Sequence, residues 1–355
     1  MISSFDNRIR KVCALAAATL VFPSLRWMLQ FTVLIVPQVL WGVASASQTW
    51  HATVGAQSND KGHQALAFLP NEIWINAGDC IEWRFDVDEP HTVTFIPDSE
   101  IRPFFGNIPA PLPSNPATFN DSTTVSSPGA PASVFVKGAT FTVSFPTTGN
   151  FKQVCLFHQN MTGVVHVLDA NAPLPHSQDF YDRQAADQRR DLLSDRDSGL
   201  FAACQEHGSL KARVVTAGIG EISATAGGTQ TLSVVRFIDD QVHIRAGDTA
   251  EWTNQDPVTP HTITFGTEPP NPNLPSLNVT VDADGALHAV IKSPTENVNS
   301  GLIMAGAQDP ASGLGEPQTP LGVTRFRVTF PNPGVFPYKC ALHDALGMTG
   351  TVIVQ

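Results

Sequence analysis

The feature that most constrains the fold is an internal repeat. Gly78–Trp83 (GDCIEW) and Gly247–Trp252 (GDTAEW) share four identities in six, and Pro90–Phe95 (PHTVTF) recurs as Pro260–Phe265 (PHTITF) about 170 residues later. Further on, Phe141–Pro146 matches Phe326–Pro331 at a shift of 185, so the second copy has about 15 extra residues between its halves, which we place in a loop. A repeat of this length predicts two domains of the same fold.

The composition and the apolar pattern favour β structure within each copy. Ile73 and Ile75 in the first copy, like Val242 and Ile244 in the second, alternate with polar residues as half-buried strands do. The 28 Pro and 26 Gly suit short strands joined by turns better than a helical bundle. We expect one all-β domain over 47–169 and another over 213–355. Trp83 and Trp252 are expected in the two cores, and the Pro- and Gly-rich segments 96–132 and 266–321 are expected to be surface loops or covers over a site.

An acidic linker, 170–212, separates the two copies. Ser177 is a suitable N-cap, the residues after it favour a helix, and Gly199 is a suitable stop. The segment therefore predicts a structured linker with a helix, the alternative being a solvated tether. Cys204 in this linker could form a disulfide with Cys80, whose side chain we place on the outer face of its strand; two unpaired thiols are the alternative.

The segment 1–46 has the pattern of an export signal or a membrane anchor. Four basic residues, the last of them Arg26, precede an uncharged run of 17 residues from Trp27 to Val43, and Ala44-Ser45-Ala46 follows as a cleavage pattern. We expect cleavage, with an uncleaved anchor as the alternative, and a location in the periplasm or on the outer face of the cytoplasmic membrane. Removing 1–46 leaves 17 Lys and Arg against 31 Asp and Glu, a net charge of −14, which argues against general nucleic-acid binding.

The residues that carry chemistry recur at the end of each copy. The first copy has Cys155, His158 and Met161 in a C-x2-H-x2-M pattern, and the second has Cys340, His343 and Met348 in a C-x2-H-x4-M pattern. Without 1–46 the chain has only four Cys and three Met, yet two of each lie in these short stretches. A thiolate, imidazoles and a weak thioether are the ligands of an electron-transfer copper site. The second imidazole of each site would come from His91 or His261, which begin equivalent strands.

These motifs resemble those of the plastocyanin and azurin family of blue copper proteins, the cupredoxins. The loop of the second copy is similar to that of plastocyanin, and the shorter loop of the first is similar to that of amicyanin. The resemblance implies two Greek-key β-sandwiches, each with one type 1 copper at one end, one ligand on an early strand and three on the last loop. The chain departs from the family pattern in one respect: Thr92 and Thr262 follow the upstream histidines, where Asn is usual. We expect the threonine hydroxyl to tie the two ligand loops together.

The resemblance also implies how such a protein meets its partner. In relatives the C-terminal histidine ligand reaches the surface within an apolar docking patch, for which this chain offers Leu156, Phe157, Leu342, Ala345 and Leu346. The acidic charge would attract a basic redox protein such as a cytochrome.

Three functions are consistent with the motifs. The favoured one is a non-enzymatic copper electron carrier of the cell envelope. The second is a copper-binding or storage protein without a redox partner. The third is a two-domain oxidase or nitrite reductase, but such enzymes need a histidine next to the ligand Cys, where this chain has Val154 and Lys339. A histidine cluster between subunits would have to use His51, His63 or His288.

Overall fold

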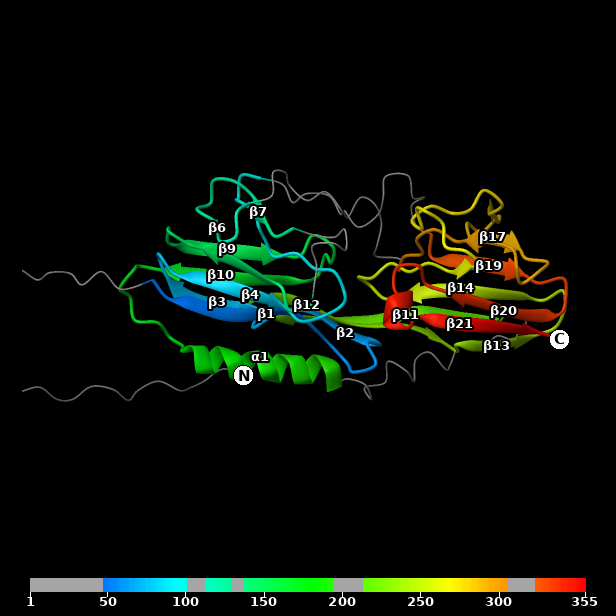
Figure 1. The fold of residues 1–355 in the computed structure, drawn as a ribbon, viewed down its shortest axis with the longest axis horizontal. Coiled ribbons are helices and arrows are strands. Elements are labelled where there is room, and N and C mark those ends of the chain that lie inside the picture. Colours follow the sequence, from blue (N-terminus) through cyan, green and yellow to red (C-terminus); the bar gives the residue numbers. More distant parts are fainter. Residues whose placement is uncertain (1–46, 101–112, 129–136, 195–212, 306–322) are drawn as a thin grey trace, which may run out of the picture. The chain divides into compact units, whose positions relative to one another are not determined.

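Each copy of the repeat forms a sandwich of two β-sheets (Figure 1). The computed structural model describes residues 47–100, 113–128, 137–194, 213–305 and 323–355. The expected signal or anchor, Gly199 and Cys204 lie outside these ranges. None of the helices within them is long and apolar enough to span a membrane. The expected architecture, mostly β with one α-helix between two β-sandwiches, is confirmed within these ranges.

The described part of the first domain contains ten strands. They are β1 (Thr49–Gln57), β2 (His63–Leu69), β3 (Glu72–Asn76), β4 (Cys80–Phe85), β5 (Thr94–Phe95), β6 (Ala117–Thr118), β7 (Val125–Ser126), β8 (Thr140–Ser144), β9 (Gly149–Val154) and β10 (Thr162–Leu168). One sheet has the order β2-β1-β4-β8-β6 and the other has the order β3-β10-β9-β5-β7. Alternation works as expected: in β4, Ile81 and Trp83 are buried between the sheets while Cys80 and Glu82 are only partly buried on the other face.

The second domain repeats this arrangement. Its strands are β11 (Arg213–Thr225), β12 (Gly228–Ile238), β13 (Gln241–Ile244), β14 (Thr249–Gln255), β15 (Thr264–Phe265), β16 (Thr280–Val281), β17 (Leu287–Val290), β18 (Val298–Asn299), β19 (Arg325–Thr329), β20 (Gly334–Lys339) and β21 (Thr349–Val354), with a short 3-10 helix η3 (Asp344–Leu346) before β21. The sheets have the orders β12-β11-β14-β19-β17-β16 and β13-β21-β20-β15-β18. Trp252 is fully buried, as Trp83 is in the first domain.

The segments expected to be surface loops contain short strands. In the first domain β6 pairs with β8 and β7 pairs with β5; in the second, β17 pairs with β19 and β18 pairs with β15. These strands are only two to four residues long, so they carry too few alternating residues to be recognised in the sequence. Strands β6, β7 and β18 are at sheet edges, and β17 lies between β19 and the edge strand β16, so these short strands pair backbone groups that would otherwise be left unpaired.

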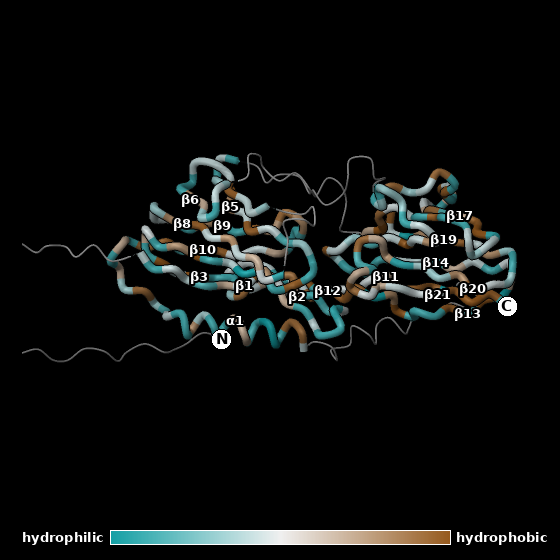
Figure 2. Tube along the Cα trace, viewed as in Figure 1, coloured by the Kyte–Doolittle hydropathy of each residue, from teal (hydrophilic) through white to brown (hydrophobic). Residues whose placement is uncertain are grey.

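The helix of the linker packs on the first domain. Helix α1 (Gln178–Ser194) lies along β1 and β2, and Figure 2 shows it as mainly hydrophilic with a few hydrophobic residues. Two of these, Tyr181 and Leu192, are buried. The hydroxyl of Tyr181 accepts a hydrogen bond from the backbone N–H of Trp74 at 2.8 Å and donates one to its carbonyl oxygen at 3.1 Å. This part of the linker is therefore structured, as predicted, rather than a solvated tether.

The two domains are joined strand to strand. Strand β2 pairs antiparallel with β12, with Leu66 opposite Thr231 and His63 opposite Val234, so one sheet of each domain continues into a single sheet of 11 strands. The side chain of Arg236 adds to the junction, because its guanidinium donates to the carbonyl oxygen of Asp60 in the first domain and to that of Leu346, at 2.8 Å, in the second.

Candidate metal centres

The structure brings the predicted site residues of each domain together at one end of its sandwich. His91 and His261 lie shortly before β5 and β15, while the three remaining residues of each set lie in the β9–β10 loop or the β20–β21 loop. All eight are at most 4% exposed: His91, Cys155, His158, Met161, His261, Cys340, His343 and Met348. The duplication in the sequence is therefore a duplication of a buried site.

The ligand-type atoms converge in the same way in both domains. In the first, Nδ1 of His91 and Nδ1 of His158 are 3.0 Å apart, and Sγ of Cys155 lies 3.6 Å from the latter and 3.9 Å from the former. In the second, the corresponding distances among His261, His343 and Cys340 are 3.2, 3.3 and 3.9 Å. Within the part of the chain that the structure describes, these are the two groups of at least three His, Cys, Asp or Glu side chains close enough to hold a metal ion.

The two ligand loops close similarly despite their different lengths. The N–H of Cys155 donates to the carbonyl oxygen of Met161 at 3.1 Å, and that of Cys340 donates to Met348 at 3.0 Å. The longer loop accommodates its two additional residues in η3, which ends at Gly347 with a φ of 92°. Met161 and Met348 are thus returned beside their cysteines and are fully buried.

The threonines that replace the usual Asn do tie the loops together. Oγ1 of Thr92 accepts a hydrogen bond from the N–H of Leu156 at 2.8 Å, and Oγ1 of Thr262 accepts one from Ala341 at the same distance. The backbone N–H of Thr92 also points at Sγ of Cys155 at 3.4 Å, as that of Thr262 points at Cys340 at 3.3 Å. Hydrogen bonds to a sulfur ligand stabilise its negative charge and tune a metal site.

The electrostatics of both sites favour the thiolate. Burial alone raises the pKa of the Cys155 and Cys340 thiols, but the surrounding histidines outweigh it and hold both pKa values well below the usual range. Burial opposes the charged form of His158 as well, yet the Cys155 thiolate and a nearby carboxylate raise the pKa of this imidazole to about 9. The thiolate is the form that binds metal, so the donor set of each site fits copper.

One glycine supports each upstream histidine, and sequence reasoning missed both. Gly55 and Gly218 interrupt the pairing of β1 with β2 and of β11 with β12, at φ values of 70° and 79°. A Cβ atom at Gly55 would lie 2.8 Å from Nε2 of His91, and one at Gly218 would lie 2.0 Å from Nε2 of His261. The two glycines are 163 residues apart (218 − 55), whereas the matching motifs are 169–170 apart, so the register of the repeat did not align them.

A carboxylate between the two sites was also missed. Glu89 is 5% exposed, and its Oε1 lies 3.4 Å from Nε2 of His158 and 3.6 Å from Nε2 of His343, the C-terminal histidine of the other domain. The two imidazoles lower the pKa of Glu89 although burial opposes this. The second copy has Thr259 at the equivalent position, so the repeat gave no hint of Glu89.

The residues expected to form docking patches are only partly exposed. Leu156 and Leu346 are buried, as are the histidines beside them, while Leu342 is 37% exposed. Phe157 is partly buried, and Ala345 is exposed. The C-terminal histidines therefore face Glu89 and the junction of the domains rather than an open surface, an arrangement that only the tertiary structure reveals.

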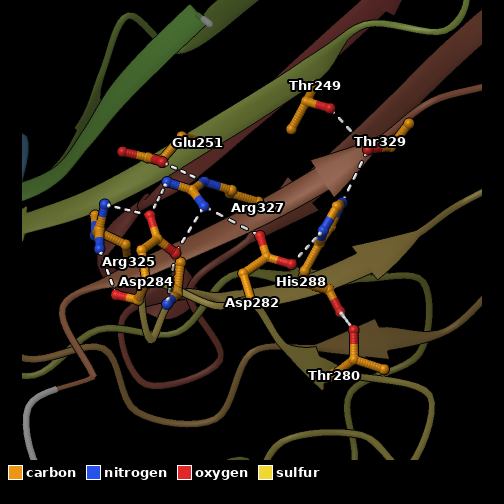
Figure 3. A network of polar contacts seen from close by, with 10 residues as sticks. Thr249, Glu251, Thr280, Asp282, Asp284, His288, Arg325, Arg327 and Thr329 are labelled. Atoms are coloured by element: carbon orange, nitrogen blue, oxygen red, sulfur yellow. Dashed lines mark hydrogen bonds and ion pairs between the residues drawn. The ribbon is translucent and has the colours of Figure 1, made fainter.

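The histidines that could have formed a further cluster lie in separate places. His51 is 3.4 Å from Glu82, and His63 is buried on β2 at the junction of the domains. His288 belongs to a polar network on the second domain (Figure 3), in which its Nδ1 lies 3.0 Å from Asp282, and Asp282 in turn contacts Arg327 at 3.1 Å. Among the described residues these histidines join no group of metal-ligand type.

Comparison with known proteins identifies the family. A model of copper binding proteins of the plastocyanin/azurin family matches residues 55–168 and 224–355. The chain therefore belongs to this family, and it has two His-Cys-His-Met type 1 copper sites, one in each domain.

Individual relatives each align with less than half of the chain. Plastocyanin of Ginkgo biloba is 28% identical over 104 residues, which is 29% of this chain and 88% of that protein. A Cu(I) structure of an amicyanin variant is 15% identical with a TM-score of 0.22, covering 42% of this chain and 87% of that one. A mutant fern plastocyanin, solved oxidised and reduced, is 18% identical with a TM-score of 0.21, covering 40% and 99%.

Proposed function

We propose that this protein is an electron carrier that uses one copper ion in each domain. The observation that carries the proposal is the convergence of a thiolate and two Nδ1 atoms in a buried site built twice on rigid β-sandwiches. The ligands would be His91, Cys155, His158 and Met161 in the first domain and His261, Cys340, His343 and Met348 in the second. Copper held by such a set supplies reversible one-electron chemistry.

The chain's own contribution is to hold the ligands still and to exclude water. Backbone hydrogen bonds fix each loop, the Thr92 and Thr262 hydroxyls join it to the upstream histidine, and burial keeps solvent away from the sulfur. A metal site that does not rearrange when its charge changes has a low reorganisation energy for electron transfer. In such a carrier no substrate has to reach the metal. The family is consistent with a carrier rather than an enzyme.

The first experiment is copper stoichiometry with visible absorption and EPR of the purified protein, repeated on Cys155→Ser and Cys340→Ser. We expect two coppers per chain, an intense blue band and only narrow-hyperfine signals, with each variant losing one site. A colourless copper-loaded protein would instead favour copper storage. A further copper with normal hyperfine splitting, together with activity, would favour an oxidase or nitrite reductase.

We further propose an exported protein, located in the periplasm or on the outer face of the cytoplasmic membrane, that exchanges electrons with a basic redox protein such as a cytochrome. The pattern of 1–46 supports the location, and the net charge of −14 left without that segment supports the partner. Association with a basic cytochrome should slow steeply as salt is added, because salt screens the attraction. A rate independent of ionic strength would mean that charge does not guide the encounter.

A further inference from the structure

Glu89 is a buried carboxylate, and a carboxylate is stable in a buried position only when it has charged or polar partners. It immediately precedes Pro90 and the upstream ligand His91, and its side chain is 5% exposed. Oε1 contacts the imidazoles of His158 and His343, and Oε2 makes no hydrogen bond to the residues that the structure describes. Because burying a charge is costly unless it is paired, these two imidazoles are what makes the position tenable.

The orientation of the rings defines which nitrogen of each histidine faces Glu89. Nδ1 of His158 faces Sγ of Cys155, and Nδ1 of His343 faces Sγ of Cys340. With Nδ1 committed to the site, Nε2 is the nitrogen that carries hydrogen in each neutral ring. One carboxylate oxygen therefore lies at ion-pair distance, 3.4 and 3.6 Å, from the Nε2 atoms of two metal-ligand histidines that belong to different domains.

The surrounding contacts hold the two histidines at this spacing. Beside the continuous pairing of β2 with β12, the Thr162 hydroxyl, next to Met161 in the first site, accepts a hydrogen bond from the N–H of Thr229 at 2.8 Å. On the other side, Arg236 fixes the carbonyl oxygen of Leu346 in the second ligand loop. The first loop is thus anchored on the neighbouring domain, and the second is tied to it through Arg236, whose guanidinium also donates to the carbonyl oxygen of Asp60.

We propose that Glu89 is a positioning residue that links the two copper sites into one redox unit. It orients both C-terminal histidine ligands and completes a path of ion-pair contacts, His158–Glu89–His343, for electron exchange between the domains. The exchange moves one electron, so that one site is oxidised by one electron and the other reduced by one, and Glu89 neither changes oxidation state nor gives up a proton. This inference rests on the proposed function.

The test compares Glu89→Ala and Glu89→Gln with Asp88→Asn. Asp88 is the adjacent acid, but its carboxylate contacts Gln57 and Lys61 rather than the histidines, so the control removes the same charge without touching the path. Glu89→Gln keeps an acceptor oxygen and removes the charge, which separates orientation from electrostatics.

The first measurement is solvent exchange of the Nε2–H protons, by NMR of the metal-free and the diamagnetic Cu(I) protein. We expect slow exchange at both His158 and His343, exchange about tenfold or more faster at both in Glu89→Ala, and no change in Asp88→Asn, since a charge-assisted hydrogen bond is worth about 1.5–3 kcal/mol. A response at His158 alone would overturn the link between the domains.

The second set of measurements uses copper binding and the redox behaviour of the loaded protein. Glu89→Ala should weaken copper binding at both sites by about 10–100-fold, the usual effect of losing a ligand's hydrogen-bond partner, and should slow electron redistribution in the half-reduced protein by about tenfold or more. Glu89→Gln should raise both reduction potentials, because the negative charge favours Cu(II), while largely keeping the exchange rate.

The outcomes distinguish the two proposals. A wild-type protein that binds two coppers and is blue, but in which Glu89→Ala and Asp88→Asn behave alike, overturns the bridge and leaves the carrier intact. A wild-type protein without blue copper overturns the carrier, while the exchange of the two Nε2–H protons in the metal-free protein still tests whether Glu89 orients both histidines.

Discussion

At the scale of single residues, each site depends on groups that are not ligands. The threonine after each upstream histidine replaces the usual amide and still joins the ligand loops, through 2.8 Å hydrogen bonds in both domains. Gly55 and Gly218 leave room for the upstream imidazoles at positions where the backbone is also left-handed. The two glycines have to be small because the backbone approaches each imidazole closely. The two threonines have to carry a hydroxyl because it accepts the hydrogen bond from the ligand loop.

The glycine behind His261 gives a sharp prediction. In Gly218→Ala the new Cβ would lie 2.0 Å from Nε2 of His261, so the ring must move, and copper binding at the second site should weaken by about 10–100-fold. Gly247→Ala is the matched control, since Gly247 has a φ of 93° but nothing within 4 Å of the added atom. Both variants should lose about 1–2 kcal/mol of stability from backbone strain. Equal copper affinities, measured by competition with a chelator, would refute the steric explanation.

At the scale of elements, strand alternation and one docked helix organise the first domain. The strands place Ile81 and Trp83 inside and leave Cys80 partly exposed. Because Cys204 lies outside the described residues, the disulfide between Cys80 and Cys204 stays a prediction. Helix α1 has few apolar residues and is attached through Tyr181, whose hydroxyl bonds both backbone groups of Trp74. The Tyr181 hydroxyl thus adds to the apolar contacts that Leu192, Ala185 and Leu193 make on the same helix.

Tyr181→Phe should loosen the helix selectively. Loss of the hydroxyl leaves the N–H and the carbonyl of Trp74 without this partner and should cost about 1–3 kcal/mol, measured by chemical unfolding. Phe180→Leu, at the neighbouring exposed position, should cost much less. Hydrogen exchange of the α1 amides should rise in Tyr181→Phe, and unchanged exchange would mean that other contacts hold the helix.

The same residue predicts a pH dependence. Burial raises the pKa of Tyr181 to about 12 from its ordinary value of 10. A group whose pKa is raised on folding contributes stability that is complete below the unfolded pKa and is lost as pH rises through the folded one. Stability should therefore fall between pH 10 and about 12, with a smaller fall in Tyr181→Phe, as followed by unfolding at each pH.

At the scale of the whole molecule, the two metal sites differ in their surroundings, and both lie near the junction of the two domains. The loops differ in length, and Oγ1 of Thr262 also approaches Sγ of Cys340 at 3.9 Å. Glu89 comes from one domain only. The pairing of β2 with β12 then fixes the sites at one junction.

These asymmetries predict separable reduction potentials. Cys155→Ser and Cys340→Ser each leave one intact site, and we expect their redox titrations to give different midpoints, because hydrogen bonding to the sulfur and the loop around it differ. Superimposable titrations of the two variants would show that the differences in sequence have no electronic effect.

The sequence by itself determined much of this protein. The repeat predicted two like domains, the alternation predicted their strands and buried Trp83 and Trp252, and the Cys-His-Met spacing with the upstream histidines predicted residues that the fold does gather. Those signals are local, since they consist of short motifs and of periods set by the backbone. Only the tertiary structure decided that His158 and His343 face one another across Glu89 instead of an open surface, because strand pairing between domains and a carboxylate reaching across their junction follow from long-range packing that no motif within either copy encodes.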